Sequence, residues 1–198
     1  MVAATHLYRS DLAERPALRS IRRLSAPFEW AFLLLAVLLC ALASAVFFFA
    51  LAPGIAEIWI GPTNAWLVIG RDTPPPGAVA LRTLAPATQI VAGGAFALIA
   101  GAAVSAMFFL RSLFACYRSG DVFGDAPQAW MRRAALALIA FAAGPVLLQP
   151  MLRAVGSPDR GWLQGHTIPV FLIGAALLVF ARVIALGREL EHESKGFV

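Results

Sequence analysis

Residues 30–52 read WAFLLLAVLLCALASAVFFFALA and contain no charged side chain. Three later stretches have the same character, and the last of them is apolar without interruption from Ile168 and continues past Arg182 to Leu186. A helix needs roughly 20 mainly apolar residues to cross about 30 Å of hydrocarbon. The sequence therefore predicts four membrane-spanning helices, at about 30–52, 90–110, 134–152 and 167–186.

The composition supports a protein solvated by lipid. Of the 198 residues, 60% are hydrophobic and 14% are charged, and the mean hydropathy is +0.78. Soluble domains average about 45–50% apolar and about 25% charged residues. We expect one membrane domain covering residues 1–198, an all-α bundle of four transmembrane helices in contact with the bilayer.

The basic residues alternate between the connecting segments. Twelve of the sixteen lysines and arginines precede the first stretch, lie between the second and third, or lie from Arg182, at the end of the fourth, onward. Short loops rich in Lys and Arg stay in the cytoplasm. This places both termini, a helical hairpin at 111–133 and a tail at 187–198 in the cytoplasm, and a loop at 53–89 outside. The net charge of +5 is read as a topology signal, and no direct contact with nucleic acid is expected.

The segment before the first span has its own helical pattern. Leu18, Ile21 and Leu24 recur at helical spacing among arginines, which is typical of a short basic helix lying on anionic headgroups. Pro27 suits the first turn of a separate membrane helix, with Glu29 near its positive end.

The outside loop contains a hairpin pattern. Residues 58–60 and 66–69 are apolar and aromatic, and they flank the turn-forming run Gly61-Pro62-Thr63-Asn64. A small β-hairpin between the first two spans is therefore expected. An isolated hairpin is marginal in water, so it would pack on helix ends, on headgroups or on a partner.

Small residues recur every fourth position in the second span, and Gly144 has a similar neighbour in the third. Such a stripe lets another backbone approach closely. Two interpretations remain open: contact between helices of one chain, or a seam between two copies in a homo-oligomer. The helix-packing candidates are Gly93, Ala97, Gly101, Ser105 and Gly144.

The cytoplasmic hairpin carries the candidate partner-binding surface. The second helix should stop at Gly120 with a left-handed cap, and Asp125 should cap the next helix ahead of Pro127. Phe123 either anchors a partner helix or packs under its own hairpin, and acidic tail residues could dock on the arginines. The candidates are Arg111, Arg118, Phe123, Arg132, Arg133, Glu189 and Glu193.

Chemistry-bearing motifs are absent from the sequence. It has no P-loop, no HExxH, no GxSxG and no cysteine pair at zinc spacing. Its hydrocarbon segments also lack the ionisable groups that ion and proton paths use. We therefore expect no catalytic residues, no metal, no cofactor and no disulfide.

Two places in the chain carry a resemblance to a known family. They are the run Gly120-Asp121-Val122-Phe123 followed by Arg132-Arg133, and the terminal helix from Arg182 through 189–193 to Phe197-Val198. With the four-span layout, they resemble a bacterial membrane-protein family known as domain of unknown function 2975. Because members are often encoded beside a small helix-turn-helix regulator, the resemblance implies a bacterial inner-membrane location and such a regulator as a cytosolic partner.

These observations favour a non-enzymatic membrane sensor or regulator that uses its cytoplasmic hairpin and tail as a binding surface. Two rivals stay open at this point. One is a small transporter or channel component, and the other is a structural or envelope-stress membrane protein.

Overall fold

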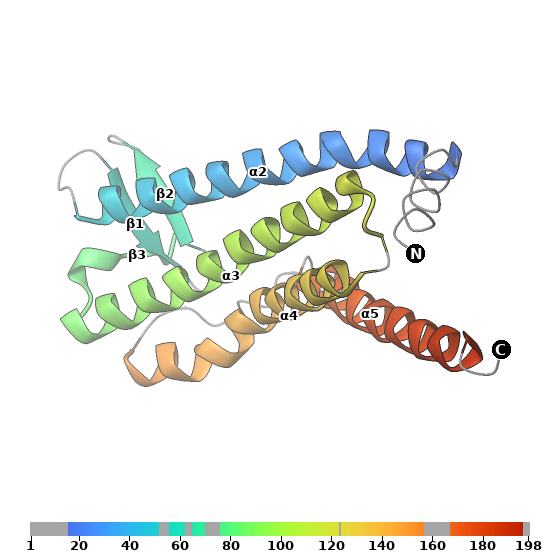
Figure 1. The fold of residues 1–198 in the computed structure, drawn as a ribbon. Coiled ribbons are helices and arrows are strands. Elements are labelled where there is room, and N and C mark those ends of the chain that lie inside the picture. Colours follow the sequence, from blue (N-terminus) through green and yellow to red (C-terminus); the bar gives the residue numbers. More distant parts are fainter. Residues whose placement is uncertain are drawn as a thin grey trace. The chain divides into compact units, whose positions relative to one another are not determined.

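Four long helices dominate the computed structural model, which describes residues 16–51, 56–61, 65–69, 76–122, 124–156 and 167–195 (Figure 1). Each is long and apolar enough to cross a membrane, so the predicted all-α, four-span membrane fold is confirmed. The helices extend beyond the predicted apolar cores at one or both ends. They are α2 (Pro16–Leu51), α3 (Pro86–Ser119), α4 (Asp125–Ala154) and α5 (Thr167–Lys195).

The chain forms two compact units, and every helix contributes to both. The first unit takes in Met1–Ala36, Ser105–Leu136 and Gly174–Val198. The second takes in Val37–Val104 and Ala137–Ile173.

A small sheet in the second unit confirms the predicted hairpin. Strand β1 (Ala56–Ile60) pairs antiparallel with β2 (Ala65–Ile69), and Ile60 lies opposite Ala65 across the predicted turn (Figure 1). A third strand, β3 (Val79–Ala80), pairs with the other edge of β1, giving the order β2-β1-β3. The sequence did not predict β3, because two residues show no alternation.

A short 3₁₀ turn, η1 (Leu81–Thr83), joins the sheet to α3. The Thr83 hydroxyl donates a 2.8 Å hydrogen bond to the Ala80 carbonyl. The side-chain amide of Gln89 reaches back from α3 and donates to the carbonyls of Arg82 and Leu84, at 3.2 and 2.9 Å. The turn is therefore fixed from both sides.

The rest of the second unit is held by contacts between its helical segments. Phe47 of α2 meets Phe96 of α3 edge to face, with ring centroids 5.7 Å apart. The Thr88 hydroxyl of α3 donates to the Val155 carbonyl just after α4. Gly144 of α4 is closely opposed to α3, because a Cβ there would lie 3.0 Å from Cγ1 of Ile99.

In the first unit, α3, α4 and α5 share a buried apolar cluster. Leu113, Met131 and Ala181 form its centre, one from each helix. Alanines at 134 and 135 on α4 are fully buried, which lets backbones approach closely. The partly buried side chains around the centre are Tyr117, Trp130, Leu177 and Ile184.

The start of α2 differs from the prediction. The basic segment and the membrane helix form one continuous helix with Pro27 inside it, so the prediction of two separate helices, with Glu29 in a first turn, is wrong. An interior proline removes one backbone donor and costs about 3 kcal/mol or more. Contacts with α3 from both sides of Pro27, made by Arg22 and Glu29, offset that cost.

Much of the apolar surface is exposed, as expected for a chain that faces lipid. On α2 alone, large side chains point outward over several turns. In water such a surface would drive association, whereas in a bilayer it is solvated by lipid chains. The outward side chains of α2 include Leu34, Leu38, Leu42 and Phe48.

Candidate functional site

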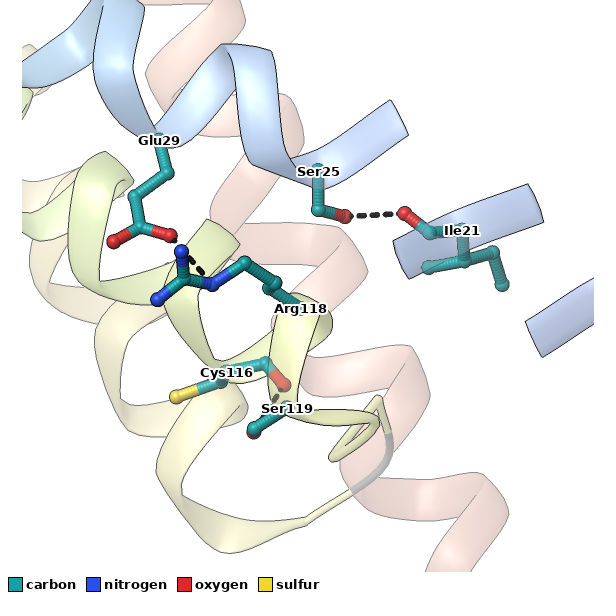
Figure 2. Close-up of polar contacts among 6 residues, drawn as sticks. All are labelled: Ile21, Ser25, Glu29, Cys116, Arg118 and Ser119. Carbon is teal, nitrogen blue, oxygen red and sulfur yellow. Dashed lines mark hydrogen bonds and ion pairs between the residues drawn. The ribbon is translucent and has the colours of Figure 1, made fainter. Parts of the chain in front are cut away.

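An ion pair joins α2 to α3 in the first unit. Figure 2 shows Glu29 of α2 and Arg118 of α3 pointing toward each other, with Glu29 Oε2 3.0 Å from Arg118 Nε. The contact is an ion pair without a hydrogen bond, because Glu29 Oε2 accepts no well-aligned hydrogen bond from the described residues. Only 8% of the Glu29 side chain is exposed, against 51% of Arg118. The carboxylate therefore relies on this guanidinium to neutralise its charge, whereas the half-exposed guanidinium is also solvated.

Aromatic rings also join α2 to α3 in this unit. Phe114 of α3 stacks against both Phe28 and Phe32 of α2, with centroids 5.2 and 5.5 Å apart. It also meets Tyr117 edge to face at 5.8 Å. Aromatic pairs in these geometries contribute about 0.5–1.5 kcal/mol beyond their buried area. The rings fix the relative rotation of α2 and α3, and so hold Glu29 opposite Arg118.

The end of α3 confirms the predicted glycine cap. Gly120 has a φ of +90°, its N–H donates to the Tyr117 carbonyl at 3.1 Å, and the next N–H, of Asp121, donates to the Cys116 carbonyl at 3.1 Å. These are the two bonds of a Schellman motif. The predicted stop of α3 at Gly120 is therefore correct.

Side chains tighten the turn that follows. The Asp121 carboxylate accepts the Gly124 N–H at 2.8 Å, and α4 then begins at Asp125, close to the predicted start. From α2, Arg22 Nη2 donates to the Ser119 carbonyl at 3.2 Å, which satisfies one of the free carbonyls at the end of α3. We call this part of the first unit, from Tyr117 to Arg133, the α3–α4 corner.

The predicted partner-binding arginines have different environments. The Arg111 guanidinium lies 5.8 Å from the centre of the Phe108 ring, and its buried Nε has no hydrogen-bond partner among the described residues. Arg118 pairs with Glu29. Arg132 is exposed, and Arg133 is exposed with its guanidinium 4.6 Å from the Trp130 ring centre, a cation–π contact. Only Arg132 and Arg133 present their charge outward from the start of α4.

The remaining predicted contacts of this surface lie outside the described residues. They involve Phe123 and the side chains of Glu189 and Glu193. The choice between Phe123 as an anchor and as a packing residue stays open, and so does the docking of the tail on the arginines.

The predicted small-residue stripe faces outward over most of its length. Gly93 lies near Phe47, since a Cβ there would be 3.9 Å from Cε1 of that ring. Ala97 and Gly101 are exposed, and a Cβ at Gly101 would meet no atom within 4 Å; Ser105 is half-buried. The prediction that the stripe makes a close contact with another helix of this chain is therefore wrong at Gly101. A seam between two copies stays a prediction.

Gly144 does pack as predicted, but against a different residue of α3. Its neighbour is Ile99, which is two positions away from both Ala97 and Gly101. The row of α3 that meets α4 in the second unit therefore contains Ile99 and the buried Ala95.

The described residues contain no group of three or more His, Cys, Asp or Glu side chains that could hold a metal ion. Both cysteines, Cys40 and Cys116, are free.

Sequence reasoning missed two polar features. The first is the pairing of Glu29 with Arg118. The only available signal was that Glu29 is a single acid among the basic and apolar residues between Glu14 and Glu57. The second is Arg82, whose Nη2 is buried without a hydrogen-bond partner among the described residues, and nothing in its local sequence distinguishes it from a loop arginine.

Comparison with known proteins adds no relative: no protein-family model, curated protein or solved structure matches this chain. The resemblance to domain of unknown function 2975 therefore stays a prediction that rests on the residues quoted for it.

Proposed function

We propose that this multi-pass membrane protein is a non-enzymatic sensor or regulator and that its α3–α4 corner faces the cytoplasm and binds a soluble partner there. The observation that carries the proposal is the exposure of Arg132 and Arg133 at the start of α4, beside a turn that is fixed on several sides. Two neighbouring guanidinium groups suit an acidic protein surface, and a restrained turn before them loses less loop entropy on binding.

The partner class follows from the family resemblance. A small helix-turn-helix regulator with an acidic face would be held at the membrane by these arginines and released when the contact weakens. Because charges at the rim of an interface mainly steer association, we expect the binding to weaken as salt is raised.

Site-specific photocrosslinking in intact cells tests the proposal. Positions 132 and 136 lie on the same face of α4, one turn apart, and both side chains are exposed. A photoreactive residue at 132 should crosslink to a soluble protein, whereas one at 136, within the predicted apolar span, should crosslink to lipid. Recovery of lipid alone from both positions would contradict the proposal.

Charge variants test whether the partner binds the arginines or only lies close to them. With the photoreactive residue at exposed Ala129, the double variant Arg132→Lys/Arg133→Lys should retain most of the soluble crosslink, and Arg132→Glu/Arg133→Glu should lose it. Equal yields from the two double variants would show that the arginines do not bind the partner.

A further inference from the structure

A cavity of about 360 Å³ lies in the second unit. Its walls come from α2, β1, η1 and the first turns of α3. Most of the lining is apolar, with one cation and one amide. The lining residues are Phe47, Ile58, Leu81, Arg82, Gln89, Ile90, Gly93 and Gly94.

Arg82 is the unusual member of this lining. Its Nη2 atom is inaccessible to solvent and has no hydrogen-bond partner among the described residues. A buried guanidinium without a partner is costly, because it loses its hydration and gains nothing in return. The two hydrogen bonds from the Gln89 amide to the carbonyls of Arg82 and Leu84 fix the backbone that carries this cation. Arg82 therefore brings a cation to the lining of the cavity, and no described residue supplies an acceptor for its Nη2.

Two glycines keep the space beside α3 open. A Cβ at Gly94 would meet no atom within 4 Å, and one at Gly93 would only touch Phe47 at 3.9 Å. Side chains at these positions would project into the space that the cavity occupies.

The apolar wall continues onto the surface that faces lipid. Ile90, which is 75% exposed, lines the cavity and is also the first residue of the predicted second span. Phe47, at the end of the first span, is 38% exposed. Arg82 lies four residues before α3 begins, so we expect its charge at the depth of the headgroups, where arginines at span ends place their charge. A ligand could thus enter from the bilayer with its charged end at Arg82.

We propose that this cavity binds one anionic phospholipid of the surrounding bilayer, with its headgroup phosphate on Arg82 and an acyl chain along Phe47 and Ile90. A guanidinium pairs with phosphate oxygens through charge-assisted hydrogen bonds. The volume falls within the roughly 300–1,000 Å³ that small-molecule sites occupy. An anionic headgroup is preferred over a zwitterionic one because a second cation would lie beside Arg82. The proposal rests on the membrane fold and not on partner binding at the α3–α4 corner.

Native mass spectrometry of the delipidated full-length protein in detergent tests this site. The probes are phosphatidylglycerol, phosphatidylcholine with the same acyl chains, and inorganic phosphate. We expect one phosphatidylglycerol to be retained about tenfold more tightly than phosphatidylcholine, and no retention of inorganic phosphate. Arg82→Gln should reduce phosphatidylglycerol retention to the phosphatidylcholine level, and Arg82→Lys should fall between the two.

A second pair of variants guards against a folding defect in Arg82→Gln. Gly94→Leu fills the cavity while leaving Arg82 in place, and Gly101→Leu makes the same change two turns further along α3 at a position that is also open but does not line the cavity. Leucine favours a helix over glycine at both sites. Gly94→Leu should lose phosphatidylglycerol retention about tenfold, and Gly101→Leu should keep it.

Three outcomes would overturn the proposal. They are equal retention of the two phospholipids by the unaltered protein, unchanged phosphatidylglycerol retention in both Arg82→Gln and Gly94→Leu, and displacement of the lipid by inorganic phosphate.

Discussion

Glu29 and Arg118 are unequal partners, because the carboxylate is buried and the guanidinium is half exposed. If Arg118 is removed, a buried carboxylate is left without a cation. If Glu29 is neutralised, Arg118 can turn its guanidinium to water or to headgroups. Removing Arg118 should therefore destabilise the protein more than neutralising Glu29, because of the difference in burial. The lost attraction between the charges is the same in both variants.

We predict that Arg118→Gln destabilises the folded protein by about 1–3 kcal/mol, below the roughly 3–5 kcal/mol of a fully buried pair, since exposed charges are screened. Glu29→Gln should cost less than Arg118→Gln. Reversible unfolding of the purified protein in mixed micelles, followed by tryptophan fluorescence, measures both.

Arg132→Gln is the matched control, since it removes the same charge from an exposed position of the same unit, and its stability should stay close to that of the unaltered protein. The double variant Glu29→Gln/Arg118→Gln should be more stable than Arg118→Gln alone. If all four variants unfold at the same denaturant concentration as the unaltered protein, the ion pair contributes nothing to stability.

For single residues, the sequence predicts contacts between residues close in the chain. It does not predict contacts that depend on how two helices are rotated against each other. The cap at Gly120 follows from residues within one turn, and so does the beginning of α4 near Asp125. The partner of Glu29 was not, since it depends on how α2 and α3 are rotated, which the stacking of Phe28 and Phe32 on Phe114 decides.

Among the helices, α3 shows most clearly that a small-residue sequence pattern need not be the place where another helix makes contact. Its small residues mark where a close approach is sterically allowed, but the approach of α4 occurs at Ile99 instead. Gly144 supplies the room for that contact from the α4 side. The glycine that matters for packing within the chain is therefore Gly144.

Leucine substitutions at two glycines compare these faces directly. We predict that Gly144→Leu destabilises the protein by about 1–3 kcal/mol, because a side chain must displace Ile99, whose Cγ1 lies 3.0 Å from the Cβ position. Gly101→Leu should be neutral or slightly stabilising in the monomer. Thermal unfolding in detergent, monitored by size-exclusion chromatography, gives the comparison.

The second-site variant Ile99→Ala should recover part of the loss in Gly144→Leu by making room for the new side chain. A loss in Gly101→Leu as large as that in Gly144→Leu would reject this assignment of faces. A loss in Gly101→Leu that appears only in an oligomer would instead support the seam between two copies.

The spans and the hairpin were predictable because lipid and strand pairing leave few alternatives. Charge-free stretches of this length must be helical in hydrocarbon, and residues 61–64 have the composition of a turn between two strands. The strand β3 and the passage of α2 through Pro27 were not predictable, since both depend on contacts made elsewhere in the fold.

For the whole molecule, the distribution of arginines predicts orientation. The α3–α4 corner is rich in arginine, while the segment between α2 and α3 contains Arg71 and Arg82. From the positive-inside rule we predict that the corner is cytoplasmic and that the sheet is outside.

Cysteine labelling tests this orientation. In a background with Cys40→Ala and Cys116→Ala, Ala85→Cys should react with a membrane-impermeant maleimide from outside, and Ala129→Cys only after permeabilisation; both positions are exposed. Gly120 is unsuitable for such a probe, because its φ of +90° strains other residues and a Cβ there would meet the Arg22 guanidinium. Labelling of position 129 from outside would reverse the topology.

The contact between Glu29 and Arg118 also has a consequence for how the protein is made. A ribosome finishes the first apolar helix long before it reaches Arg118, and during that interval the nascent chain carries a carboxylate with no counter-charge from this helix pair. The helix that neutralises it is synthesised afterwards. α2 therefore gains this counter-charge only after α3 has been made, and we expect the order of translation to be part of the assembly pathway.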